Sequence, residues 1–369
     1  MHLHNLRKNI DKNDMYSLLV NFPSELEKSF KEYEKINIPE TLKIRGKIKN
    51  ISEIRNVVII GMGGSAIGGD IIISYLYKKI KIPIFLIRDY VLPGFINNHT
   101  LLVGVSYSGN TDETLLAFLE GIKLGAYPII ITSDGLFEKI SDKINVPTFK
   151  LPIGRPPRTS TAYMLSALLH ILEKSNVVSL DRDEIYSTFY FLKKVIERYS
   201  SLEENTLPVQ LALTIKDKIP LIYTYKPYTP IGYRFKTQLN ENAKYHAFFG
   251  EFPEVDHNEI MGWENETNKD YIPIFLEGRF GEESTKTMMI YWKILFDHKD
   301  IKYITLKGIG KNILADMLYL LVTGDFTSYI LALLEKIDPT PVTTITGLKD
   351  YLTKNTSLRQ RVLEEMKNL

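Results

Sequence analysis

A glycine-rich segment follows an apolar run near the start of the chain. Residues 61–70 hold five glycines and come directly after the β-branched run Val57–Ile60. Glycine lets a ligand approach the backbone closely, and the first turn of a helix offers unpaired N–H groups and the positive end of its dipole. A strand, a glycine loop and a helix in this order predict an anion-binding site. The simpler interpretation is a tight turn that packs a helix against a sheet without a ligand.

A second loop, residues 106–111, reads Ser-Tyr-Ser-Gly-Asn-Thr and follows the apolar run Leu101–Val105. Three hydroxyl groups around a glycine at a helix start can hold a phosphate dianion without a lysine. These hydroxyl residues are Ser106, Ser108 and Thr111. Asp112 and Glu113 would repel a dianion if they faced it, but acidic residues are favoured in the first turn of any helix. Two such loops on neighbouring strand–helix pairs favour a phosphate site.

Two other phosphate-binding motifs compete with this interpretation. A Walker A loop needs a lysine directly after its last glycine, and the first loop has none there. The dinucleotide fingerprint G-x-G-x-x-G fits from Gly61 if its last position is Ala66. An NAD(P)-dependent enzyme built on Gly61, Gly63 and Asp89 is therefore an alternative, although no residues for the nicotinamide side stand out.

The polar segment 240–259 carries a glutamate and a histidine that could do acid–base chemistry. The apolar pattern of residues 233–243 predicts a helix with Glu241 in its final turn, and His257 falls in a polar loop. From composition alone, Glu241 would be a surface residue and His257 a loop histidine. Three residues of the segment could instead be metal ligands, although their spacing matches no standard site: His246, His257 and Glu259.

The two loops together resemble the phosphate-binding loops of the sugar isomerase (SIS) domain. The similarity lies in Gly63-Gly64-Ser65 and in the S-x-S-G-x-T pattern of residues 106–111. In SIS domains these loops grip the phosphate of a phosphosugar. The second half of the chain has no comparable loop after the apolar run Pro220–Thr224, which implies one phosphate site per chain.

Further segments resemble the bifunctional phosphoglucose/phosphomannose isomerase branch of the SIS family, over roughly residues 50–352. They are N-E-N-A-K at 240–244, P-E-x-x-H-N-E at 253–259, Pro-Pro-Arg at 156–158, and Asp-Pro-Thr-Pro-Val at 338–342 with Leu-Lys at 348–349. The resemblance implies a cofactor-free isomerase that interconverts glucose 6-phosphate and mannose 6-phosphate with fructose 6-phosphate through a cis-enediol(ate). Such a reaction needs a carboxylate base, a cation beside the enediolate, and a donor–acceptor group for ring opening.

The resemblance assigns these catalytic roles to individual residues. Glu241 is the base that moves the proton between C1 and C2, and His257 opens the ring. Arg158 stabilises the enediolate, with Arg155 as a neighbouring rival. Lys349 assists ring opening, although a lysine on an amphipathic helix is usually solvated.

The resemblance also assigns substrate-binding residues and a quaternary structure. Residues that hold the phosphate are Gly64, Ser65, Ser106, Ser108 and Thr111. Thr340, as a small residue near C3, would let the substrate rotate about C2–C3 and present either epimer, but Thr340-Pro341 is equally an N-cap and first residue of a helix. In the family the histidine comes from the other protomer, which implies a homodimer with His257 donated across the interface.

Strands and helices that could position these residues are predicted by an alternation of apolar runs and helical patterns along the chain. Short runs that are apolar throughout, such as Ile84–Ile87 and Pro128–Ile131, alternate with helical patterns. This alternation is typical of parallel sheets covered on both faces. The expected fold class is α/β, with two tandem SIS-type subdomains, each a mainly parallel sheet flanked by helices. The stretch from Asn312 to Ile337 is expected to be helical with an interruption near Gly324.

The apolar density drops near residues 200–208, which suggests a domain boundary. We therefore expect four segments: an N-terminal helical segment (1–50), a subdomain with the phosphate-binding loops (51–200), a subdomain with the Glu/His segment (201–340), and a C-terminal helical segment that carries Lys349 (341–369).

Composition excludes several classes of protein. Lys plus Arg number 46 and Asp plus Glu 44, a net charge of +2 that argues against a nucleic-acid partner. The chain contains no cysteine, so disulfides and thiolate sites are excluded. Neither a signal peptide nor a membrane partner is expected, and a cytoplasmic location follows by default. No cofactor or metal is expected either. A phosphosugar-sensing SIS regulator is the remaining alternative, but the first 50 residues show no recognition helix.

Overall fold

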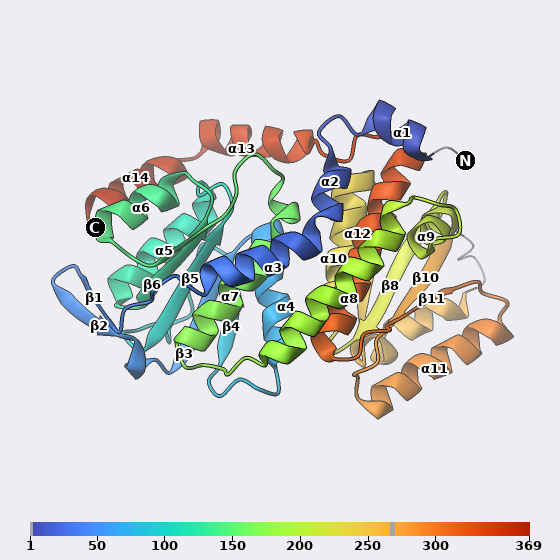
Figure 1. Ribbon diagram of the computed structural model, residues 1–369, viewed down its shortest axis with the longest axis horizontal. Coiled ribbons are helices and arrows are strands. Elements are labelled where there is room, and N and C mark those ends of the chain that lie inside the picture. Colours follow the sequence, from blue (N-terminus) through green and yellow to red (C-terminus); the bar gives the residue numbers. More distant parts are fainter. Residues whose placement is uncertain (1–2, 266–269) are drawn as a thin grey trace. The chain divides into compact units, whose positions relative to one another are not determined.

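The computed structural model describes residues 3–265 and 270–369, which form two compact units (Figure 1). Unit 1 comprises Met1–Ser24 and Asp181–Pro341, and unit 2 comprises Glu25–Leu180 and Val342–Leu369. Each unit contains one all-parallel sheet flanked by helices, as expected for tandem SIS-type α/β domains.

The sheet of unit 2 has five strands in the order β4-β3-β5-β6-β7. Their bounds are β3 Asn56–Gly61, β4 Ile84–Ile87, β5 Thr100–Ser106, β6 Tyr127–Thr132 and β7 Thr148–Lys150. Strands β5 and β6 are buried along their whole length, as expected for strands covered on both faces. Because β3 and β5 are parallel neighbours, the loops that follow them leave the same edge of the sheet.

Helices cover both faces of this sheet. Their bounds are α3 Phe22–Tyr33, α4 Ile67–Leu76, α5 Asp112–Leu124, α6 Leu136–Ile144 and α7 Thr161–Lys174. A Cβ at Gly69 of α4 would touch Ile59, whereas a Cβ at Gly104 would meet Phe118 of α5 and Phe137 of α6. Gly104 pairs with Ile60, the neighbour of Ile59, so the two contacts lie on opposite faces.

Unit 2 also contains elements outside its five-stranded sheet and the helices that cover it. The expectation of a helical segment over residues 1–50 is wrong at its end, where β1 (Thr41–Ile44) and β2 (Lys47–Asn50) form an antiparallel hairpin. The C-terminal helices are α13 (Thr343–Asn355) and α14 (Leu358–Lys367).

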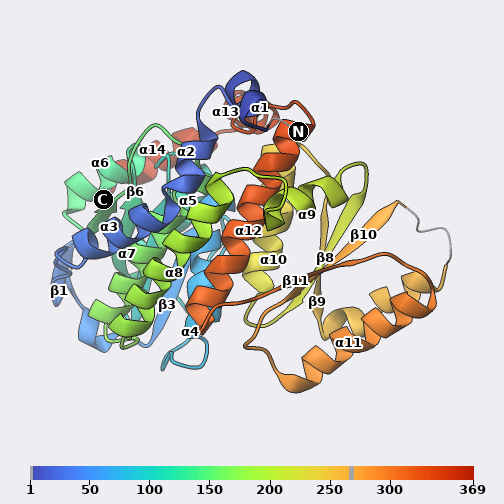
Figure 2. The same ribbon diagram turned by 45° about the vertical axis from the view of Figure 1, so that its right-hand side comes forward.

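The sheet of unit 1 has four strands in the order β11-β10-β8-β9. Their bounds are β8 Ile219–Tyr225, β9 Phe248–Phe252, β10 Tyr271–Glu277 and β11 Ile304–Lys307. A Cβ at Gly232 of α10 (Thr229–Ala243) would touch Thr224, whereas the ring of Trp292 of α11 (Glu283–His298) packs against Tyr223 at a tilt of 59°. Adjacent strand residues point to opposite faces, so α10 and α11 cover opposite faces of this sheet (Figure 2).

The remaining helices of unit 1 pack around α12 (Ile313–Leu334). They are α1 Leu3–Ile10, α2 Met15–Val20, α8 Arg182–Ser200 and α9 Leu207–Ile215. Helix α12 is long and apolar enough to cross a membrane by length and composition, but 94% of its apolar window is buried inside the structure. The expected interruption at Gly324 is wrong: α12 is continuous, and a Cβ at Gly324 would lie 3.0 Å from the ring of Phe235, so the glycine serves close helix packing.

The boundary between the compact units, at Leu180/Asp181, differs from the domain boundary near residues 200–208 that the apolar density suggested. Helix α8 groups with unit 1 because it packs on α12, where the Tyr199 and Thr323 hydroxyls lie 3.0 Å apart. The N-terminal helices group with the same unit, since the Tyr329 hydroxyl of α12 donates to Asp11 at 3.0 Å. Both contacts join parts of the chain that are distant in sequence.

Candidate functional site

The two predicted phosphate loops meet at the carboxyl edge of the unit 2 sheet. After β3 the chain makes a 3₁₀ turn over Gly63–Ser65, and after β5 it runs through residues 106–111 into α5. The backbone N–H of Tyr107 donates to Ser65 Oγ at 3.1 Å, which joins the loops directly. Ser65 is buried, and by accepting this hydrogen bond its hydroxyl oxygen holds the start of the second loop in place.

The second loop forms a tight turn ahead of α5. Ser106 Oγ donates to Thr111 Oγ1 at 3.0 Å, and the N–H of Asn110 donates to Ser108 Oγ at 3.3 Å. Gly109 has φ of +62°, and a Cβ there would lie 1.7 Å from the carbonyl oxygen of Asp134, so only glycine fits. The three hydroxyl groups predicted from the sequence therefore lie on one turn at the start of α5.

Arg158 lies on a 3₁₀ turn, Pro157–Thr159, and is 2% exposed. The glycine loop approaches it closely: a Cβ at Gly64 would lie 2.8 Å from the backbone nitrogen of Arg158. Arg155, the rival in the sequence, instead makes a two-pronged ion pair with Glu25, with nitrogen–oxygen distances of 2.8 and 2.9 Å. Arg155 therefore anchors α3 through Glu25, whereas Arg158 adjoins the predicted phosphate loop.

Lys349 lies in the same unit but on a separate element. It is exposed on α13, a helix with no buried residue. The expected N-cap role of Thr340-Pro341 is wrong, because α13 begins at Thr343. The N–H of Thr340 donates instead to Asp338 Oδ1 at 3.0 Å, which turns the chain before the helix starts.

Glu241 lies in the final turn of α10 in unit 1, as the helical pattern predicts, and is half-buried. Lys244 caps this helix end with φ of 55°, and its Nζ donates to the carbonyls of Glu241 at 2.8 Å and Asn242 at 3.4 Å. The same ammonium group donates to the carbonyls of Asp338 at 3.1 Å and Pro339 at 3.3 Å. Lys244 therefore ties the helix end that carries Glu241 to the segment that leads to Thr340.

His257 ends the 3₁₀ turn Glu254–His257, which follows β9, and it is exposed. Its neighbour Asp256 accepts a hydrogen bond from Trp292 Nε1 at 2.7 Å. Burial raises the pKa of the Asp256 carboxyl, while the Trp292 hydrogen bond and the charge of His257 oppose the rise. Glu259 accepts from the Tyr223 hydroxyl at 2.5 Å, so anchored carboxylates lie on both sides of His257.

The carboxyl edge of the unit 1 sheet holds a buried polar cluster rather than a hydroxyl-bearing glycine loop. Asp316 accepts from the Tyr228 hydroxyl at 2.7 Å and from the N–H groups of Arg279 at 2.7 Å and Gly310 at 2.6 Å. A Cβ at Gly278 would lie 1.9 Å from the Tyr228 ring, so this edge is filled. Burial, reinforced by the hydrogen bond to Asp316, raises the pKa of Tyr228 well above its usual range.

Two further alternatives from the sequence are a ribose-binding acid and a metal site. Asp89, the candidate ribose acid, accepts from the N–H groups of Tyr90 at 2.6 Å and Val91 at 3.4 Å, as in a local turn. Within residues 3–265 and 270–369, no three histidine or carboxylate side chains are arranged to hold a metal ion.

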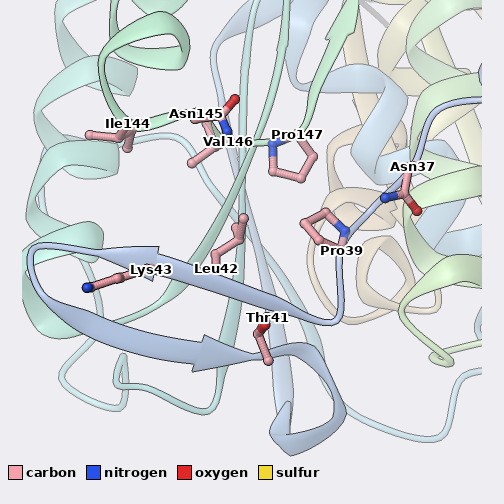
Figure 3. A pocket seen from close by; sticks show the side chains of 9 residues that line it. All are labelled: Asn37, Pro39, Thr41, Leu42, Lys43, Ile144, Asn145, Val146 and Pro147. Carbon is pink, nitrogen blue, oxygen red and sulfur yellow. The ribbon is translucent and has the colours of Figure 1, made fainter.

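A pocket of about 500 Å³ lies at the opposite edge of the unit 2 sheet (Figure 3). Its walls come from the segment around β1, including Lys43, and from the turn between α6 and β7, including Asn145. That turn precedes β7, so the pocket lies at the amino ends of the parallel strands. It is therefore separate from the loops after β3 and β5.

Sequence reasoning missed Lys244 as a residue that holds the Glu241 helix, and it missed the cluster around Asp316. Lys244 stands inside the N-E-N-A-K segment, which was the available signal. The cluster around Asp316 had no local signal, because its partners Tyr228, Arg279 and Gly310 lie in three separate segments of the chain.

Comparison with known proteins places these features in a family. A family model described as the bacterial phospho-glucose isomerase C-terminal SIS domain matches residues 204–352. The solved C-terminal domain of glucosamine-fructose-6-phosphate aminotransferase from Francisella tularensis has a similar fold, with a TM-score of 0.63 and 15% identity over 90% of this chain and 98% of that one.

Two relatives are similar in sequence as well. A D-glucosamine-6-phosphate 4-epimerase of Sulfolobus acidocaldarius is 30% identical over 269 residues, 72% of this chain and 80% of that protein. A bifunctional phosphoglucose/phosphomannose isomerase of Caldicellulosiruptor bescii is 34% identical over 345 residues, 92% of this chain and 98% of that protein. A match of that extent at that identity shows that the chain belongs to the bifunctional phosphoglucose/phosphomannose isomerase family of SIS-domain proteins.

Proposed function

We propose that the chain is a cofactor-free aldose–ketose isomerase that interconverts glucose 6-phosphate and mannose 6-phosphate with fructose 6-phosphate. The observation that carries the proposal is the 34% identity to a bifunctional isomerase across 92% of the chain. The joined hydroxyl loops of unit 2 support it, since they offer hydroxyl groups and a helix N-terminus to a phosphate dianion. The proposed phosphate ligands are Gly64, Ser65, Ser106, Ser108 and Thr111.

The proposed reaction moves one carbon-bound proton, from C2 to C1, and one hydroxyl proton, from O2 to O1, within the substrate. The Glu241 carboxylate takes the proton from C2 of the open-chain aldose, the C–H electron pair forms the C1–C2 double bond, and the carbonyl oxygen gains the negative charge. Arg158 stabilises that charge as a cation beside the enediolate. The hydroxyl proton of O2 passes to O1, the O2 electron pair forms the C2 carbonyl, and the electrons of the C1–C2 double bond take the proton back from Glu241 at C1 to give the ketose, so no electrons leave the substrate and no redox cofactor is consumed.

Ring opening and the tolerance of two epimers are assigned to other residues. His257 transfers the proton between the ring oxygen and the C1 hydroxyl, a role that suits imidazole near neutral pH. Lys349 assists this step. Thr340 leaves room for rotation about C2–C3, so that either C2 epimer presents its proton to Glu241.

The proposed assembly is a homodimer in which His257 serves the site of the partner. The exposed position of His257 is consistent with that role. Mixing E241Q and H257N protein tests it, because a mixed dimer would hold one doubly substituted site and one intact site. Recovery of about a quarter of wild-type activity is expected from random exchange of subunits, whereas sites confined to one protomer would recover none.

The direct test of the function is a coupled assay that starts from fructose 6-phosphate and detects both aldose products. E241Q should lower kcat by at least about 100-fold, since it removes the base and keeps its shape. E197Q, the same substitution at an exposed position of α8, is the matched control and should leave kcat unchanged. Full activity of E241Q would contradict the proposed mechanism.

A second candidate follows from the 30% identical relative named a D-glucosamine-6-phosphate 4-epimerase. Incubation with glucosamine 6-phosphate, followed by NMR of the sugar, distinguishes this activity from aldose–ketose isomerisation. Tight binding of fructose 6-phosphate without turnover would favour a sensor, and binding of NAD(P) in calorimetry would favour the dinucleotide enzyme. A cytoplasmic location is proposed with the isomerase function, because charged phosphosugars do not cross a bilayer unaided.

A further inference from the structure

The C-terminal helix α14 contacts the predicted phosphate loop. Helix α14 packs along α5 in unit 2 (Figure 1) and follows residue 352, where the family-model match ends. Its Arg359 donates from the guanidinium group to the carbonyl of Asn110 at 2.6 Å and pairs with Asp112 Oδ1 at 3.1 Å. Both partners flank Thr111, the last residue of the loop, so α14 reaches the start of α5.

A second ion pair joins the same two helices at their other end. Lys123, in the last turn of α5, pairs with Glu365 of α14. Arg359 and Lys123 have almost the same exposed fraction, 31% and 32%. The two pairs therefore hold the same helices together, but only the Arg359 pair adjoins the phosphate loop.

The Arg359 ion pair holds the two helices together and also acts on the negative charge at the start of α5. Asp112 is 17% exposed and lies in the first turn of α5, beside the N–H groups proposed to receive a dianion. Burial raises the pKa of the Tyr90 hydroxyl, and Glu113 in the same turn adds to that rise. Burial raises the pKa of the Asp112 carboxyl, the Arg359 guanidinium opposes that rise, and Glu113 adds to it. An uncompensated carboxylate at this position would repel the phosphate.

We propose that Arg359 is a positioning residue of the phosphate loop: its guanidinium compensates the charge of Asp112 and anchors the Asn110 carbonyl, so that the start of α5 can receive a dianion. The identification of that dianion as the phosphate of a sugar rests on the function proposed above. The residues after 352 thereby gain a role in substrate affinity.

Calorimetric titration with fructose 6-phosphate and with inorganic phosphate tests the proposal without requiring turnover. R359Q should raise both dissociation constants about tenfold, roughly the effect of one uncompensated charge near a dianion in a partly screened site. K123Q, the matched control at the other end of the two helices, should leave both constants unchanged. Equal affinities for R359Q and the wild type, or an equal loss in K123Q, would overturn the proposal.

A double variant separates charge compensation from helix tethering. D112N/R359Q removes the carboxylate along with its partner, so both dissociation constants should return to within about threefold of the wild-type values. Affinities as weak as those of R359Q alone would overturn charge compensation. Wild-type protein that binds fructose 6-phosphate without isomerising it would contradict the proposed function, while the R359Q and K123Q titrations would still decide the role of Arg359.

Discussion

Gly64 lies so close to Arg158 that no side chain fits between the glycine loop and the arginine turn. A Cβ at Gly64 would lie 2.8 Å from the backbone nitrogen and 3.0 Å from the Cα atom of Arg158. Both neighbours are backbone atoms, so relief requires that one of the two segments move. The contact explains why a glycine stands at this position, and it fixes the proposed phosphate loop relative to the proposed enediolate-stabilising residue.

Gly64→Ala is therefore expected to displace Arg158 from the phosphate loop. We expect the free energy of unfolding to fall by about 1–3 kcal/mol and kcat/KM to fall by at least tenfold, as for other overpacked or displaced sites. Urea unfolding and the fructose 6-phosphate assay measure the two effects. Gly94→Ala is the control, because a Cβ there meets no atom within 4 Å. Equal kcat/KM in the two variants would show that the contact does not matter for activity.

Lys244→Met should lower kcat more than it lowers stability. The Lys244 ammonium group joins the carbonyls of Glu241 and Asn242 to those of Asp338 and Pro339. Without it, the end of α10 and the segment before Thr340 lose a shared anchor. Small displacements of a catalytic group are costly, so if Glu241 is the base as proposed, kcat should fall about 10- to 100-fold, while the KM for fructose 6-phosphate changes little because the proposed phosphate loops are untouched.

Lys174→Met is the matched control for this prediction. Lys174 also caps backbone carbonyls, those of Glu34 at 2.7 Å and Ile36 at 2.5 Å, but it lies at the end of α7 that is distant from Arg158. Each variant should lose about 0.3–1 kcal/mol of stability as a helix-end cation is removed. An equal fall in kcat in both variants would show that Lys244 affects activity only through general destabilisation.

The fold was largely predictable because the strands are short apolar runs bounded by turn residues. Ile84–Ile87 forms β4 with the predicted bounds, and the pattern of residues 233–243 ends where α10 ends, at Ala243. The β1–β2 hairpin was not predictable in the same way, because its turn places Arg45 at φ of 51°, where asparagine or aspartate would be the usual signal. Continuity of α12 past Gly324 depends on a contact with Phe235, which no local pattern reveals.

The sequence predicted the residue types of the candidate site, but few of the contacts that hold those residues in place. Hydroxyls and glycines at two strand ends identified the loops, but the Tyr107–Ser65 hydrogen bond depends on β3 and β5 being neighbours. Lys244 reaches a carbonyl 94 residues away, and Arg359 reaches one 249 residues away. Contacts of that separation follow from the packing of the whole unit, so sequence patterning cannot supply them.

Arg234→Met should destabilise unit 1 strongly. Arg234 of α10 and Asp325 of α12 form a two-pronged ion pair with distances of 3.0 and 2.8 Å, and the side chains are 4% and 5% exposed. Removing one partner leaves a buried charge, so the free energy of unfolding should fall by about 3–5 kcal/mol in urea titrations. The double variant R234M/D325L should recover most of that loss. A double variant as unstable as R234M would show that packing, rather than charge, dominates at this contact.

Tyr228→Phe should lower stability at neutral pH by an amount that shrinks in alkali. The substitution leaves Asp316 and the N–H of Phe280 each without one hydrogen bond, which should cost about 1–3 kcal/mol at pH 8. Burial raises the pKa of Tyr228 above its ordinary value of 10.0, so its stabilising contribution is complete below pH 10 and is lost as the pH rises further. The difference between wild type and Y228F should therefore shrink by about 1 kcal/mol between pH 10 and 11 in urea titrations. Y291F, at an exposed position of α11, should match the wild type at each pH, and a Y228F difference that stayed constant up to pH 11 would contradict the predicted ionisation behaviour.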